Sequence, residues 1–153
     1  MKKRQKSMLT EVIIVVTITT IAVLGMINFK DYINKSEAIK SMTNLSIIVK
    51  NHKEKYGTIP PESFIEQVKD NLQGSLRLGG LQYRSRWIDF DPPADTILAY
   101  AERNYGSPFV GDGYVVLRLD GQVQWMEKKE FEQILATQQS PDEIELLKKV
   151  PSK

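Results

Sequence analysis

Acidic side chains offer the widest chemistry in this chain. Paired carboxylates act as general acid and base when their surroundings push their pKa values apart. Six carboxylates lie between positions 89 and 120, at Asp89, Asp91, Asp95, Glu102, Asp112 and Asp120. The chain has no cysteine, a single histidine, no phosphate-binding glycine loop with a lysine, and no spacing typical of a metal site. The sequence therefore predicts a protein that is not an enzyme.

Glu11 differs from these carboxylates because it lies just inside the edge of the apolar stretch SMLTEVIIVVTITTIAVLGMINF, residues 7–29. Residues 12–29 carry no charge and, with Met8 and Leu9, approach the ~20 residues that cross a bilayer. A carboxylate at the centre of such a helix costs ~2.5–3.5 kcal/mol, and less near its end. Glu11 is therefore interpreted as functional with a charged partner. The alternative is a side chain that reaches the rim of the membrane.

Charges around this stretch orient it. Lys2, Lys3, Arg4 and Lys6 precede it, so the positive-inside rule places the N-terminus in the cytoplasm and the chain after Phe29 on the other side. These four charges exceed the net charge of +2, so the remainder is slightly acidic and nucleic acid is not an expected partner. A cleaved secretory signal is the alternative, but the apolar run is longer than such signals have and no small-x-small site follows it.

The segment KKRQKSMLTEVIIVVTITTIAVLG resembles the start of type IV prepilins and type II secretion pseudopilins. The resemblance implies that a prepilin peptidase cuts between Lys6 and Ser7, with methylation of the new amine. Glu11 then becomes the fifth residue and pairs with that amine, or with a neighbouring subunit's. The family has Gly before the cut and usually Phe after it, where this chain has Lys6 and Ser7, or Met8 if the register moves by one. A chain that keeps its leader is the alternative.

The segment DYINKSEAIKSMTNLSIIVKNHKEKY, residues 31–56, predicts an amphipathic helix that continues the spanning one to about 70 Å. Its apolar stripe is formed by Ala38, Met42, Leu45, Val49, His52 and Tyr56. Gly57 and Pro60-Pro61 end the helix. His52 is expected to pack in this stripe without a function. The stretch NLSIIVKNHKEKYGTIPPESF resembles the pseudopilin region where this helix stops.

The rest of the chain predicts a short helix in 61–72, strands at 81–90, 95–101, 113–119 and 122–126, and helices at 127–138 and 140–150. Asp120-Gly121 predicts a type I′ hairpin turn. The aromatic side chains are expected in core and cross-strand packing, with a ligand platform as the alternative. Arg77, Arg84 and Arg86 are expected on a solvated face of the sheet, with contact to an acidic neighbour as the alternative. The segments ILAYAERNYGSPFVGDGYVVL and GYVVLRLDGQVQWMEKKEFEQIL resemble the C-terminal region of pseudopilin-like proteins.

We therefore expect an α+β fold with a basic leader (1–6), a transmembrane half-helix (7–29), an exported half-helix (30–56) and a pilin-like domain (57–153). The resemblance implies a structural subunit of a type II secretion or type IV pilus-like filament in the bacterial inner membrane. Its partners would be other pilin-like subunits, the prepilin peptidase and lipid. The alternative is an unprocessed anchored protein whose exported domain binds an envelope component. No cofactor is expected, except that some pseudopilins hold calcium in a loop comparable to that of Asp112, with Asp120 as a second candidate.

Overall fold

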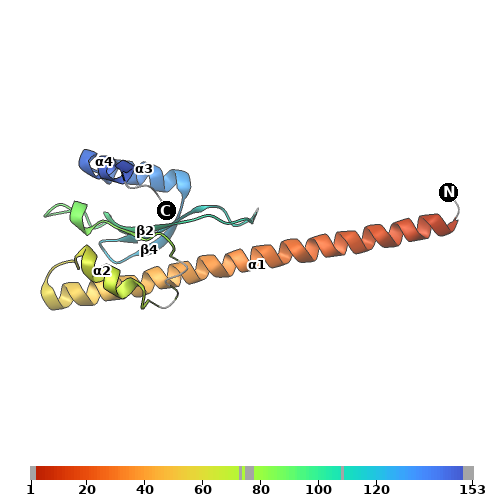
Figure 1. Cartoon of the computed structure of the whole chain (residues 1–153), viewed down its shortest axis with the longest axis horizontal. Helices are drawn as coiled ribbons and strands as arrows, with labels where there is room; N and C mark the ends of the chain where they lie inside the picture. The colour runs from red at the N-terminus through yellow and green to blue at the C-terminus, as the bar shows by residue number, and fades with distance from the viewer. Residues whose placement is uncertain (1–2, 73, 75–77, 108, 150–153) are drawn as a thin grey trace.

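The computed structural model describes residues 3–72, 74, 78–107 and 109–149, with side chains from Ser7 to Leu146. One helix, α1 (Lys3–Tyr56), has 54 residues and a length of about 80 Å. Figure 1 shows the small domain lying along the second half of α1, while the first half projects alone. The predicted continuous helix is confirmed. It begins at Lys3, so the described part of the leader is helical as well.

A four-stranded antiparallel sheet forms the centre of the domain. Its strands are β1 (Gln82–Tyr83), β2 (Ile97–Arg103), β3 (Gly113–Arg118) and β4 (Val123–Glu127), in the order β1-β2-β3-β4. Helix α1 covers one face, and α3 (Lys128–Gln138) covers the other, followed by α4 (Pro141–Lys149). Alternate residues of β3 face the two sides, with Val115 and Leu117 toward α1 and Val116 toward Phe131 of α3. The predicted α+β class is confirmed.

The apolar stripe of α1 seals one core. Ala38, Met42, Leu45 and Val49 are buried against the sheet, as the helical spacing predicts. Tyr56 is 60 % exposed, so its assignment to the stripe is wrong. The final turn of α1 is exposed, and Gly57 (φ +75°) follows its last residue.

His52 is packed, as expected. Its ring lies 4.6 Å from that of Tyr56 and 5.1 Å from that of Phe64, and Nδ1 is 3.0 Å from the Thr58 carbonyl oxygen. Phe64 belongs to α2 (Glu62–Lys69), which lies within the predicted 61–72 and buries Ile65 against the core. His52 thus connects the last turns of α1 with the following turn, through Thr58, and with α2, through Phe64.

The predicted strand at 81–90 is wrong for all but two residues. After β1 the chain turns into a short 3₁₀ helix, η2 (Ser85–Trp87). The cause is Arg84, whose buried guanidinium donates to both oxygens of Glu143 at 2.7 and 2.9 Å and to the carbonyl of Ile97 at 2.7 Å. A solvated position is therefore wrong for Arg84. Arg86 is exposed, and Arg77 lies outside the described residues.

The β3–β4 hairpin is confirmed, but its turn type is wrong. A type I′ turn needs positive φ at both central residues, and here Gly121 has φ +87° while Asp120 does not have a positive φ. Gly121 N–H donates to the Arg118 carbonyl at 3.0 Å, and Arg118 N–H donates to Gln122 at 3.0 Å. Residues 119–121 thus form a three-residue loop that ends in a glycine bulge.

The other predicted elements agree within two residues. Strand β2 begins at Ile97 instead of Asp95 and ends at Arg103 instead of Ala101. Helix α4 begins after Ser140, whose Oγ accepts the N–H of Glu143 at 3.2 Å, as the capping pattern predicts. Tyr114 stacks on Phe131 with ring centroids 3.9 Å apart, and Tyr105 lies 5.8 Å from Trp125. These contacts confirm the predicted aromatic packing.

Candidate functional site

The first half of α1 has no cover within the described chain. Every side chain from Ser7 to Ile27 is exposed, including a continuous series of valines, isoleucines and leucines. A soluble domain rarely leaves so large an apolar surface without a purpose. This helix is long and apolar enough to cross a membrane.

Polar side chains in this half donate hydrogen bonds to backbone carbonyls of the same helix. The hydroxyls of Thr17, Thr19 and Thr20 each donate to the carbonyl four residues earlier at 2.8 Å. Asn28 makes the equivalent bond to Leu24 at 2.8 Å. None of these donors needs water, which suits a hydrocarbon environment.

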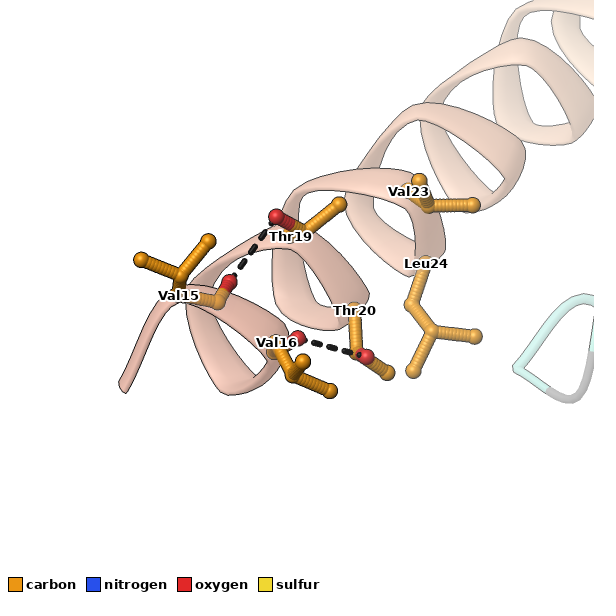
Figure 2. Close-up of a pocket in the computed structure, with 6 residues that line it drawn as sticks. All are labelled: Val15, Val16, Thr19, Thr20, Val23 and Leu24. Atoms are coloured by element: carbon orange, nitrogen blue, oxygen red, sulfur yellow. Dashed lines mark hydrogen bonds between the residues drawn. The ribbon is translucent and has the colours of Figure 1, made fainter. Parts of the chain in front are cut away.

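Figure 2 shows a shallow hollow on the same stretch of α1, lined by Val15, Val16, Thr19, Thr20, Val23 and Leu24. All its lining side chains come from one helix, so it cannot enclose a small molecule as a pocket between elements does. A groove between the side-chain rows of a helix instead fits a row of side chains from a second helix.

Glu11 lies one turn after Ser7, and the two predicted residues are in contact. Ser7 Oγ donates to Glu11 Oε1 at 3.2 Å, which is long for an O–H···O bond. Both residues are exposed. The side chain of Lys6 lies outside the described residues, but the helix runs through the Lys6–Ser7 peptide bond. The carboxylate therefore has a neutral neighbour and remains accessible to a cation.

The two calcium candidates are not brought together. Asp112 and Asp120 lie at opposite ends of β3, roughly 25 Å apart along an extended segment. Asp112 Oδ1 accepts the N–H of Tyr105 at 2.6 Å, and Asp120 Oδ1 accepts that of Gln122 at 2.8 Å. Both carboxylates thus fix loops. Within the described ranges, no group of three histidine or acidic side chains is arranged to hold a metal.

We call residues 7–27 the bare half of α1. The domain contacts the helix just after this bare half ends. Ser107, in the loop 104–112 between β2 and β3, is buried, and its hydroxyl donates to Asn28 Oδ1. Asp31 is buried in the same region, next to Tyr105. Burial is the main cause that raises the pKa of Tyr105, and the Asp31 carboxylate adds to it. The boundary between the two halves is therefore a packed contact.

Further contacts seat the domain along α1. The Lys35 ammonium lies 4.1 Å from the ring centroid of Trp125, and burial lowers its pKa against the opposing effect of Glu127. Ser46 Oγ donates to the Gly121 carbonyl at 2.8 Å. Together with the Asn28 contact, these interactions hold the sheet against α1 at three levels.

Sequence reasoning missed Asn28, Ser107 and Phe109. The available signal was the stretch GSPFVG, residues 106–111, which carries an exposed phenylalanine and no charge between two strands. Comparisons with protein families, with curated proteins and with solved structures gave no match to this chain.

Proposed function

We propose that this protein is a structural, pilin-like subunit of a type II secretion or type IV pilus-like filament. One observation carries the proposal: a single helix that is mostly apolar and exposed at every residue from Ser7 to Ile27, while its second half bears a small α+β domain. Such a chain has one half made for lipid or for other helices and one half made for water. Its function is assembly rather than catalysis.

In this proposal the bare half anchors the subunit in the bacterial inner membrane. The basic leader stays in the cytoplasm, and the domain is exported to the periplasmic or extracellular side. Lipid is the first partner, and the helices of other pilin-like subunits are the second. The hollow around Thr19 and Thr20 supports this assignment, because threonines are among the small side chains that let helices approach closely in membranes.

Glu11 would set the register of assembly. A prepilin peptidase that cuts before Ser7 would leave an amine one helical turn from Glu11, on the residue whose hydroxyl already reaches the carboxylate. A carboxylate in a low-dielectric bundle is stable only with such a cationic partner. Pairing of Glu11 with its own or a neighbour's amine would therefore favour one axial offset between helices.

A second candidate function is an anchored protein that keeps its leader and binds an envelope component through its domain. Two observations favour it. Lys6 stands where the family has Gly. The Lys6–Ser7 bond also lies within α1, so a peptidase must first unwind a helical turn.

The mature N-terminus separates these functions. The full chain is extracted from membranes, and its intact mass and N-terminal sequence are determined beside a Lys6→Gly variant. We expect a chain that begins at Ser7 or Met8 with a methylated amine, and more complete cleavage in the variant. An intact leader in both proteins would contradict assembly through Glu11 and favour the anchored alternative.

A further inference from the structure

We propose that the described residues of the β2–β3 loop (104–107 and 109–112) rest on the membrane, with the Phe109 side chain among the lipid headgroups beside the point where α1 leaves the bilayer. This inference rests on the proposed membrane-spanning role of the bare half of α1. Its partner is the lipid surface itself. The domain would then have two attachments to the membrane, the helix and this loop.

The level of the loop along α1 is the first argument. From Glu11 to Asp31 the helix rises by about 30 Å, the thickness of a bilayer's hydrocarbon core. Asn28 therefore lies within about one turn of the outer boundary when Glu11 lies at the inner one. The hydrogen bond from Ser107 to Asn28 brings the loop to this level. Figure 1 shows the loop after β2 extending toward the bare half of α1.

The chemistry of the loop is the second argument. Phe109 is 79 % exposed, and residues 104–111 carry no charged side chain. Phe29 and Tyr32 are also exposed on α1 at this level. Tyrosine and tryptophan concentrate where hydrocarbon meets water because their rings are amphipathic, and phenylalanine is among the apolar side chains that segments lying at this interface insert into it. Phe109 would thus add a third exposed aromatic side chain at the level where α1 leaves the bilayer.

The loop is also held in place before any lipid binds. Ser107 Oγ accepts the N–H groups of Phe109 at 3.1 Å and Val110 at 3.3 Å while donating to Asn28. Asp112 Oδ1 closes the base of the loop by accepting the N–H of Tyr105 at 2.6 Å. An exposed phenylalanine on a fixed loop loses little conformational entropy when it enters an interface.

Phe90 provides the matched control. It is fully exposed and Phe109 is 79 % exposed, but Phe90 lies in the loop that precedes β2, whereas Phe109 lies in the loop that follows β2. The two phenylalanines therefore lie beyond opposite ends of the same strand. Because the natural chain has no cysteine, Phe109→Cys, Phe90→Cys and Val16→Cys each create one labelling site without touching the buried core.

The test uses the full chain reconstituted in phosphatidylcholine vesicles, with an environment-sensitive nitrobenzoxadiazole label at each cysteine. Lipid that carries a nitroxide near its headgroup serves as the quencher. We expect the label at position 109 to be quenched several-fold more strongly than the label at position 90, and to emit at shorter wavelength. The label at position 16 reports whether the helix itself is inserted.

The results distinguish a failure of the loop contact from a failure of the spanning helix. Quenching at 16 with equal, weak quenching at 109 and 90 would overturn the loop contact and leave the anchor intact. Absence of lipid contact at 16 would overturn the spanning helix and the loop contact together. Emission at short wavelength from the label at position 109 that is lost as the protein is diluted into more lipid would mean that Phe109 contacts a second copy of the chain. That result would overturn the contact with lipid.

Discussion

The two halves of α1 belong to one helix but depend on different surroundings. In the second half, Ala38, Met42, Leu45 and Val49 form a single stripe that the sheet covers. In the first half, apolar side chains point in every direction and nothing in the described chain covers them. The domain therefore covers the apolar stripe of the second half, whereas in the proposed function lipid or other helices would cover the apolar side chains of the first half.

The largest effect is expected at the ion pair on the far side of the sheet. Glu143→Ala leaves the buried guanidinium of Arg84 without its carboxylate, and we expect a loss of about 3–5 kcal/mol in the free energy of unfolding. Denaturant unfolding of detergent-solubilised protein, followed by tryptophan fluorescence, measures it. Asp142→Ala removes an exposed carboxylate from the same turn and should cost less than about 1 kcal/mol. Equal losses would contradict the role of the pair.

Substitution of one leucine in each half of α1 tests whether the two halves contribute differently to the stability of the domain. Leu45 is fully buried, whereas Leu24 is 42 % exposed in the bare half. We expect Leu45→Ala to lower the free energy of unfolding of the domain by about 2–5 kcal/mol, because it leaves a cavity under the sheet. Leu24→Ala should change it by less than about 0.5 kcal/mol. The same unfolding measurement applies, and a large loss from Leu24→Ala would mean that the halves are not independent.

Glu11→Gln should weaken assembly and leave the domain unchanged. Loss of one ion pair with an amine is expected to lower the yield of intersubunit cross-links about tenfold, which corresponds to ~1.4 kcal/mol. The yield is measured as disulfide dimers in membranes through a single Val16→Cys site. Glu62→Gln, which alters an exposed carboxylate of α2, is the control. If both variants cross-link alike, Glu11 does not set the register.

The smallest loss of stability is expected from the hydrogen bond between Tyr83 and the segment that follows α1. Tyr83 donates its hydroxyl to the Pro60 carbonyl at 2.9 Å, and burial raises its pKa. The neutral phenol therefore stabilises the fold fully below pH ~10, where unfolded tyrosine titrates, and this contribution is lost as pH rises further. Tyr83→Phe should cost about 1 kcal/mol at neutral pH.

The alkaline profile separates this tyrosine from the others. Because the Tyr83→Phe variant has no proton to lose at this position, its unfolding free energy should fall less steeply above pH ~10 than that of the natural chain. Unfolding curves collected at several pH values measure the slope. Tyr56→Phe, which alters a tyrosine that is 60 % exposed, is the control. An unchanged slope in Tyr83→Phe would refute the assignment.

Much of the fold could be predicted because its signals are local. The stripe from Ala38 to Val49, the glycine stop at Gly57 and the cap at Ser140 each depend on residues a few positions apart. The misplaced strand at 81–90 has a distant cause, since Arg84 meets a carboxylate 59 residues later in the chain. No local pattern distinguishes such an arginine from one on a solvated sheet.

In the candidate site too, contacts between residues close in sequence could be predicted, and contacts between distant residues could not. Ser7 and Glu11 are four residues apart, so helical geometry alone brings them together. The contact of Asn28 with Ser107 spans 79 residues and depends on how the sheet sits along α1. The sequence therefore predicted the apolar half and its carboxylate, while the boundary with the domain required the structure.

The unbroken course of α1 also has a mechanical consequence. Since α1 is unbroken from Ser7 to Tyr56, a rotation of its first half would turn the domain with it. Moving the helix by one residue along its screw raises the domain by about 1.5 Å and turns it by about 100°. If Glu11 sets the axial offset as proposed, it would therefore also determine the direction in which the domain faces.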